Sequence, residues 1–158
     1  SARIPPVEQP VNVWDLERAA QARLDAGPWG YYAGGAGDER TLADRDHRRL
    51  GGISYGAAWA LLLAARFPEL WSAVGAHSPA IGSFNGIEPD AAALARGHVR
   101  AYLDVGDRDG LRKPTETFAS QLKQAGADFE LHIFAGRHTD AYWRAHLADY
   151  LHFYTAGW

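Results

Sequence analysis

The pentapeptide Gly52-Ile53-Ser54-Tyr55-Gly56 constrains the fold of this 158-residue chain more than any other segment. A serine framed by glycines, directly before the Ala- and Leu-rich residues 57–65, is typical of a nucleophile elbow. Such an elbow is a tight, strained turn from a strand into a helix, and its glycines remove side chains that would collide there. The segment therefore predicts a strand at residues 49–53, Ser54 at the turn and a helix after it.

Two further residues follow predicted strands. Asp109 lies in the turn-like segment 106–110, and His138 comes after the strand-like run 129–134. Because ligand sites of parallel sheets lie beyond the carboxyl ends of the strands, we expect both side chains to meet Ser54 there. A serine hydroxyl needs an imidazole base and a carboxylate that orients the base, so Ser54, His138 and Asp109 are the candidate catalytic residues.

The backbone amide of Tyr55 is the candidate donor for one half of an oxyanion hole, because it lies in the first turn of the predicted helix. Asp104 and Asp107 compete with Asp109 for the acid role, although either could instead form a local cap or turn. A purely structural interpretation also remains open, in which Ser54 caps a helix, Asp109 makes a turn and His138 lies in a loop.

Strand-like and helix-like segments alternate along the rest of the chain. We expect further strands at 73–76, 99–105 and 129–134, and helices at 55–67, 90–97, 114–125 and 140–154. This alternation predicts an α/β fold with three α/β/α layers and a short parallel sheet of about four strands. Six aromatic residues at helical spacing are expected in the core, namely Trp59, Phe67, Trp71, Trp143, Tyr150 and Phe153.

The first part of the chain has a different character. Residues 13–26 predict an amphipathic helix ended by Gly27-Pro28, and residues 30–37 form a glycine-rich loop. We therefore divide the chain into an N-terminal segment, 1–38, and a core, 39–158. The loop has no Lys-Ser or Lys-Thr and follows no strand, so it is not a phosphate-binding loop.

Composition excludes several functions. The chain has no cysteine, which excludes thiol catalysis, and its net charge of −3 gives no basic surface for nucleic acid or membranes. No two histidines have the His-x-x-x-His spacing, and Asp107-x-Asp109-Gly110 lacks the other ligands of a calcium loop, so we expect no metal and no cofactor. With no signal pattern near residue 1, a soluble, cytoplasmic protein acting on a small molecule is favoured.

Four motifs are similar to the putative-esterase family of α/β-hydrolases, which includes esterase D and enterochelin-esterase-like proteins. They are HRRLGGISYG at 47–56, PELWSAVGAHSP at 68–79, YLDVGDRD at 102–109 and FAGRHTDAYW at 134–143. The resemblance spans about residues 39–158 and implies a carboxylic-ester hydrolase with Ser54 as nucleophile, Asp109 as acid and His138 as base. Tyr55 departs from the arginine or methionine more familiar at that position.

Residues 11–42 instead resemble the N-terminus of FMN-dependent α-hydroxy-acid oxidases and lactate monooxygenases. The similarity rests on VWDLE at 13–17, YYAGGAGDE at 31–39 and Thr41-Leu42, and it would make Tyr31 a substrate contact. That family needs a whole TIM barrel to hold its flavin, and none is present, so we do not expect FMN. A recombined gene or a built chimera would explain the junction near residues 38–42.

The strands that normally precede an elbow strand are missing. Catalysis is expected to be weak, because a lost oxyanion donor typically costs about 10²- to 10³-fold in rate. The strand at 49–53 becomes an exposed edge, which predicts a homo-oligomer that covers it. The alternatives to a serine esterase are an inactive, self-associating scaffold and, more remotely, an FMN-linked hydroxy-acid enzyme.

Overall fold

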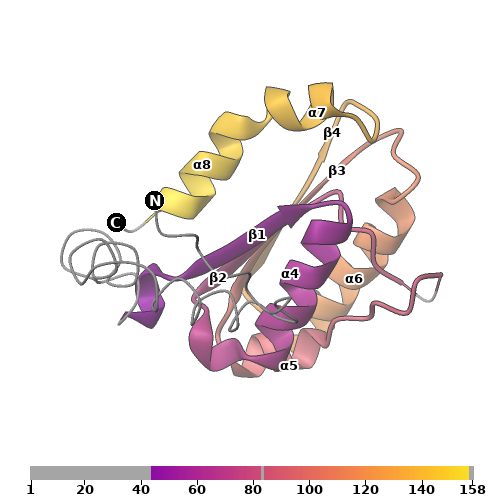
Figure 1. Ribbon diagram of the computed structural model, residues 1–158. Helices are drawn as coiled ribbons and strands as arrows, with labels where there is room; N and C mark the ends of the chain where they lie inside the picture. The colour runs from indigo at the N-terminus through magenta and orange to yellow at the C-terminus, as the bar shows by residue number, and fades with distance from the viewer. Residues whose placement is uncertain (1–43, 83, 157–158) are drawn as a thin grey trace, which may run out of the picture. The chain divides into compact units, whose positions relative to one another are not determined.

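The computed structural model describes residues 44–82 and 84–156 (Figure 1). The chain divides into two compact units, Ser1–Ala43 and Asp44–Trp158, and all described residues belong to the second. The predicted N-terminal helix, the glycine-rich loop, the FMN-oxidase-like segment and the boundary at residues 38 and 39 lie outside the described residues and stay predictions.

A parallel sheet forms the centre of the described unit. Its four strands lie in the order β1 (Arg49–Ile53), β2 (Ala73–His77), β3 (Arg100–Gly106) and β4 (Phe129–Phe134). Each strand returns to the sheet through a helical crossover, as parallel strands require. The predicted α/β fold with a short parallel sheet is confirmed, and strand ends differ from prediction by one residue at most.

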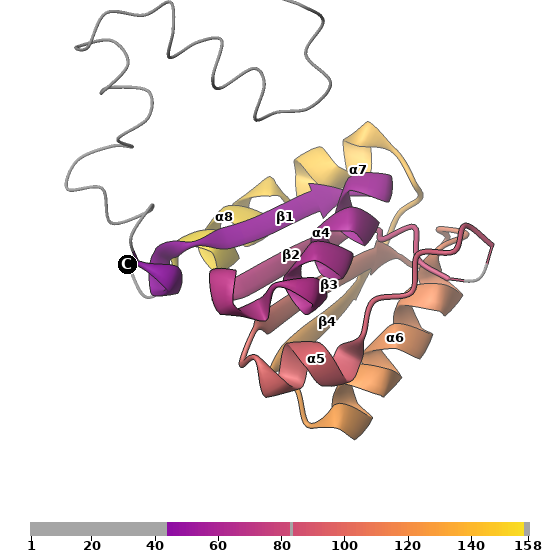
Figure 2. The ribbon, with the colours of Figure 1, turned by 60° about the horizontal axis from the view of Figure 1, so that its bottom comes forward.

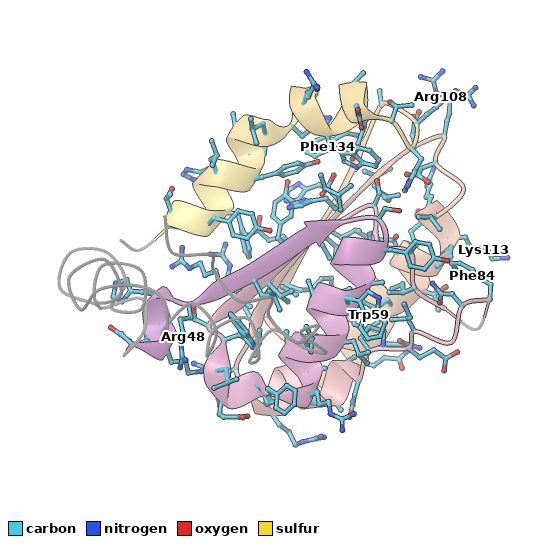
Figure 3. All side chains as sticks on the ribbon, in the orientation of Figure 1. Arg48, Trp59, Phe84, Arg108, Lys113 and Phe134 are labelled. Carbon is cyan, nitrogen blue, oxygen red and sulfur yellow. The ribbon has the colours of Figure 1, made fainter. Side chains whose placement is uncertain are left out.

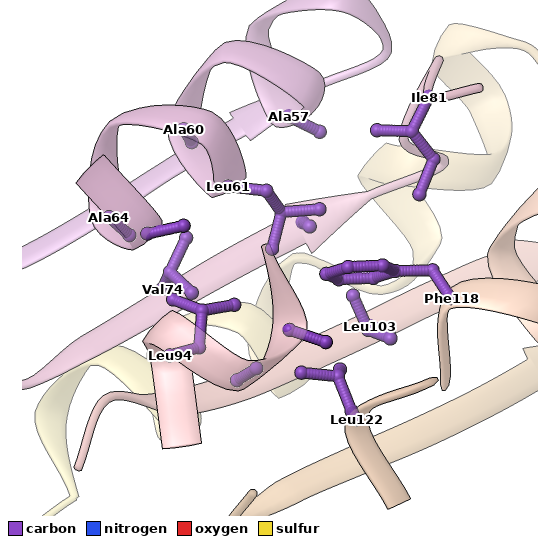
Figure 4. Close-up of a cluster of buried hydrophobic side chains, with 14 of the residues drawn as sticks. Ala57, Ala60, Leu61, Ala64, Val74, Ile81, Leu94, Leu103, Phe118 and Leu122 are labelled. Atoms are coloured by element: carbon purple, nitrogen blue, oxygen red, sulfur yellow. The ribbon is translucent and has the colours of Figure 1, made fainter. Parts of the chain in front are cut away.

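Three helices cover one face of this sheet, α4 (Tyr55–Arg66), α5 (Ala91–Arg96) and α6 (Arg112–Ala125) (Figures 1 and 2). The main hydrophobic core fills this layer. Leu61 of α4, Leu103 of β3 and Phe118 and Leu122 of α6 point toward one another there (Figure 4). β2 is buried along its whole length, which explains why its sequence is uniformly apolar up to His77.

The other face carries α7 (Asp140–Ala145) and α8 (Leu147–Thr155) (Figure 2). A second core of Tyr102, Tyr150 and Phe153 lies under them. The prediction of one continuous helix over 140–154 is wrong, because the helix breaks at His146. The imidazole of that residue stacks on Phe134 with ring centroids 4.0 Å apart, while its backbone φ of −105° leaves the α-helical region.

Two short 3₁₀ turns precede strands, η1 (Arg45–His47) before β1 and η2 (Pro68–Leu70) before β2.

Two aromatic residues predicted in the core are instead on the surface. Trp59 is 53% exposed on the outer side of α4, where Figure 3 shows it, and Phe67, which directly follows the helix, is 40% exposed. α6 also begins at Arg112, two residues before the predicted Pro114.

β1 lies at one edge of the described sheet. Gly51 and Ile53 of this strand are exposed, so the edge predicted for the elbow strand is present in the described unit. Within residues 44–82 and 84–156, no helix has the length and apolar character needed to cross a membrane.

Candidate active site

Ser54 lies in the turn between β1 and α4 with a φ of 57° and a ψ of −118°. A positive φ is unfavourable for a residue with a side chain, and strained residues of this kind cluster at functional sites. The surrounding backbone holds the conformation. The Ser54 amide donates to the His77 carbonyl at 2.9 Å, and the Ser54 carbonyl accepts from the amides of Ala58 and Ala80, each at 3.1 Å.

The two glycines of the elbow differ in their roles. A Cβ atom on Gly52 would lie 2.4 Å from the backbone carbon of Gly56 and 2.7 Å from the Ala57 nitrogen, so the first turn of α4 requires a glycine at position 52. A Cβ on Gly56 would meet no described atom within 4 Å. The predicted collision is therefore confirmed for Gly52 and wrong for Gly56.

Ser54, His138 and Asp109 form a continuous chain of hydrogen bonds. His138 Nε2 lies 2.9 Å from Ser54 Oγ, and His138 Nδ1 lies 2.9 Å from Asp109 Oδ2. The Asp109 side chain is 1% exposed and that of His138 is 35% exposed, so the carboxylate is sheltered while the imidazole reaches solvent. Asp109 Oδ1 accepts from the Leu111 amide at 2.9 Å, which fixes the orientation of the carboxylate.

The loops that carry the acid and the imidazole are tied to each other. Asp107 Oδ1 accepts from the Gly136 amide at 2.7 Å, and the Arg108 amide donates to the Gly136 carbonyl at 2.9 Å. The hydrogen bond from Gly136, helped by the charge of Arg108, holds the pKa of Asp107 below its ordinary value. Asp107 thus joins the two loops and does not contact His138 through a hydrogen bond among those the structure describes.

Asp104 belongs to a separate buried network. Its Oδ1 lies 2.6 Å from His77 Nδ1, and its Oδ2 accepts from the hydroxyls of Tyr142 at 2.8 Å and Tyr150 at 2.9 Å. Burial first, and the charge of Asp104 second, raise the pKa of both tyrosines far above the ordinary value. Sequence reasoning missed this network, although His77 and Asp104 stand at the ends of neighbouring predicted strands.

Two more residues near the site were missed. The indole of Trp143 lies edge-on to the His138 ring, with centroids 5.0 Å apart and planes at 86°, and its Nε1 donates to Ser78 Oγ at 3.2 Å. Trp143 was assigned to the core on helical spacing alone. Ser78 is fully buried and has a φ of 50°, which no sequence pattern around it indicates.

A cavity of about 610 Å³ lies between the loop after β2 and helix α6. Ile81, Ile87 and Phe118 give it apolar walls, and Phe84 and Lys113, both labelled in Figure 3, also line it. Pockets for small molecules commonly have this size and this apolar character. Within the part of the chain that the structure describes, no group of three His, Asp or Glu side chains is arranged to hold a metal ion.

The fold and site define the class of protein. A parallel sheet, helices on both faces and a nucleophile elbow at the carboxyl end of a strand are features of the α/β-hydrolases. The chain belongs to the putative-esterase family, whose sequence model matches residues 37–154.

Solved structures agree with this assignment. A ferulic acid esterase is 27% identical over 72% of this chain and 52% of its own, with a TM-score of 0.63. An enterochelin esterase from Shigella flexneri is 20% identical over 93% of this chain and 38% of its own, with a TM-score of 0.60. A fluorophosphonate-binding serine hydrolase of Staphylococcus aureus is 14% identical over 70% and 55%, with a TM-score of 0.61.

The likeness to the last two structures concerns the fold alone. The chain spans about half the length of the ferulic acid esterase that it matches. Among curated proteins, none matches this chain.

Proposed function

We propose that this protein is a serine hydrolase that cleaves a carboxylic ester through an acyl-enzyme intermediate. The hydrogen-bonded chain from Ser54 through His138 to Asp109 carries the proposal, with both bonds at 2.9 Å. Membership in the putative-esterase family supports ester hydrolysis in general terms. The elbow conformation of Ser54, which places a strained residue at the carboxyl end of β1, supports its role as the nucleophile.

In the first half-reaction, Ser54 Oγ attacks the ester carbonyl carbon while His138 Nε2 accepts the hydroxyl proton. The carbonyl oxygen becomes an oxyanion, and the backbone N–H of Tyr55 is the proposed donor to it, because the first amides of a helix have no intrahelical acceptor. When the tetrahedral intermediate collapses, the ester C–O bond breaks and His138 returns the proton to the departing alcohol. Asp109 orients the imidazole and stabilises its cationic form.

In the second half-reaction, water attacks the acyl-enzyme and His138 Nε2 takes a proton from it. Collapse of the second intermediate releases a carboxylic acid and restores the Ser54 hydroxyl. No cofactor and no external oxidant or reductant takes part, since hydrolysis only exchanges an ester bond for an alcohol and an acid. The proposed substrate is thus a small-molecule ester.

The cavity between the loop after β2 and α6 is proposed to hold an organic group of that ester, although Ser54, Asp109 and His138 are not among the residues that line it. It begins at Ile81, the residue after Ala80, whose amide binds the Ser54 carbonyl at 3.1 Å. Its apolar walls suit a hydrocarbon or aromatic group. Ile87→Trp should fill the cavity and raise the KM for p-nitrophenyl esters with long acyl chains more than for the acetate. Leu70→Trp, at an exposed position of η2, is the matched control and should affect all esters equally.

The competing candidate is a folded scaffold without catalytic competence. What favours it is that a single oxyanion donor, the Tyr55 amide, can be assigned among the described residues.

Covalent labelling separates the two candidates. The esterase should react with a fluorophosphonate probe at Ser54 and give a burst of p-nitrophenol from p-nitrophenyl acetate, because acylation releases the alcohol before deacylation. Ser54→Ala should abolish both signals, and Ser72→Ala, which changes a serine outside the site, should retain them. A folded wild-type protein that neither labels nor shows a burst would identify the scaffold.

A further inference from the structure

The segment His77–Ala80, which follows β2, contacts both sides of the candidate site. On one side it binds the backbone of Ser54 twice, through the His77 carbonyl at 2.9 Å and the Ala80 amide at 3.1 Å. On the other side, Ser78 Oγ accepts from the Trp143 indole at 3.2 Å. The segment His77–Ala80 therefore contacts Ser54 through its backbone. It contacts Trp143, the residue beside the His138 ring, through the Ser78 hydroxyl.

This segment is itself rigidly held. Ser78, Pro79 and Ala80 are all buried, and the Ser78 amide donates to the Asp104 carbonyl at 2.8 Å. Ser78 also adopts a φ of 50°. A non-glycine residue in this region costs on the order of 1–3 kcal/mol and persists only where the surroundings determine it. In this conformation Ser78 Oγ lies within hydrogen-bond distance of Trp143 Nε1.

Trp143 in turn limits where His138 can go. The two rings meet at 86° with centroids 5.0 Å apart, which is the edge-to-face arrangement that aromatic pairs prefer. His138 is about one third exposed, and its described contacts are the hydrogen bonds of its two ring nitrogens with Asp109 and Ser54 and the edge-on contact with Trp143. Without its hydrogen bond to Ser78, the Trp143 indole could change its rotamer. The His138 imidazole could then move away from Ser54.

We propose that Ser78 and Trp143 are positioning residues for His138, and that their hydrogen bond fixes the imidazole at the distance from Ser54 that proton transfer needs. This inference rests on the proposed function. Neither residue touches the reacting atoms, so both act through His138. General-base catalysis depends on such geometry, and a displacement of about 1 Å can lower a rate on the order of 10²-fold.

A double-mutant cycle tests the hydrogen bond. Ser78→Ala removes the acceptor, and Trp143→Phe keeps an aromatic ring but removes the donor. Each variant should lower kcat and the rate of fluorophosphonate labelling about tenfold, with KM changed by less than about twofold. Because both remove the same bond, the double variant should be no slower than the slower single variant. Multiplying losses, or rates equal to wild type, would overturn the proposal.

The other end of β2 supplies matched controls. Ser72 donates to the carbonyls of Asp46 and Arg48, and the buried Trp71 Nε1 has no hydrogen-bond partner in the described structure. Ser72→Ala and Trp71→Phe change the same residue types away from the site. They should leave kcat and labelling within about twofold of wild type. Equal losses in the controls would mean that Ser78 and Trp143 only stabilise the fold.

A spectroscopic measurement separates this inference from the proposed function. The NMR signal of the His138 ring protons is shifted by the Trp143 ring current, whether or not the protein is active. Ser78→Ala should move this signal, and Ser72→Ala should not. A wild-type protein that fails to label contradicts the esterase, whereas an unmoved His138 signal in Ser78→Ala contradicts the positioning role alone.

Discussion

His77 and Asp104 lie opposite each other on the adjacent strands β2 and β3, with 2.6 Å between His77 Nδ1 and Asp104 Oδ1. The pair is almost entirely buried. Its outer contacts are tyrosines of the last two helices, since Tyr142 and Tyr150 donate to Asp104 and the Tyr154 hydroxyl lies 3.1 Å from His77 Nε2. One carboxylate thus connects the sheet with both α7 and α8.

Asp104→Asn should destabilise the protein by about 3 kcal/mol. The asparagine keeps the size of the side chain but has one acceptor oxygen, so it cannot serve both His77 and the two tyrosines. The loss in the free energy of unfolding is measured by urea titration of the wild-type protein and the variant. Asp149→Asn is the control, because Asp149 is about half exposed and its pairing with His146 is at 3.3 Å. That control should cost less than about 1 kcal/mol, and an equal cost would contradict the central role of Asp104.

The surface of the sheet under Tyr154 has room for a hydroxyl only because two neighbouring strands carry glycine there. A Cβ on Gly75 would lie 2.0 Å from the Tyr154 oxygen, and a Cβ on Gly51 would lie 1.7 Å from it. Gly75→Ala should therefore destabilise the protein by about 1–3 kcal/mol through overpacking.

The shorter side chain of Tyr154→Leu should relieve this clash. In the double variant, the Gly75→Ala change should cost less than it does alone, which a cycle of unfolding free energies measures. Strictly additive costs would show that the alanine is accommodated in some other way.

Alkaline pH should unfold the protein through its buried phenols. Burial first, and the charge of Asp104 second, raise the pKa of Tyr102, Tyr142, Tyr150 and Tyr154 well above the ordinary tyrosine value. A group whose folded pKa is raised stabilises the fold fully below its unfolded pKa, about 10 for tyrosine. That stability is lost progressively as the pH rises from there toward the folded pKa.

The measurement is a titration of tyrosinate absorbance alongside far-UV circular dichroism. Four of the seven tyrosines should ionise only together with loss of helix signal. Full ionisation with the helix signal intact would contradict the burial of these hydroxyls.

The parts of this fold that sequence predicts well depend on local patterns. β4 has the predicted bounds, and α4 ends one residue before the expected Phe67, because Pro68 stops the helix. Ser54, Asp109 and His138 were selected because each follows a strand of a parallel sheet, and those strand ends do lie along one edge. The alternation of strand-like and helix-like segments along the sequence is sufficient to select these three residues.

The parts that sequence missed depend on contacts between distant segments. Trp59 was placed in the core because helical spacing does not say which side of a helix is covered, and the outer side of α4 is exposed. The hydrogen bond from Trp143 to Ser78 joins residues 65 positions apart. The unusual φ of Ser78 arises only once β2, β3 and α7 are assembled, so no local pattern could indicate it.

The edge strand β1 and the helix α4 that follows it both carry exposed apolar side chains, and we treat these side chains as one candidate surface. Three exposed residues at intervals of four along α4 contribute to it, Tyr55, Trp59 and Leu63, together with Phe67 directly after the helix and Ile53 of the edge strand. Exposed surfaces of this kind are typical of interaction sites, and an unpaired edge strand favours pairing with another strand. We propose that a second copy of this chain covers the surface, with the β1 strands paired across a two-fold axis.

Light scattering at micromolar concentration should then give a dimer. Trp59→Glu should convert it to a monomer, because the substitution puts a charge at the centre of the apolar surface of both copies at once. Phe84→Glu is the matched control, since Phe84 is 61% exposed at the cavity rim and lies on a different element; it should leave the dimer intact. A wild-type monomer with full helix content, or a dimer unaffected by Trp59→Glu, would contradict pairing through β1 and α4.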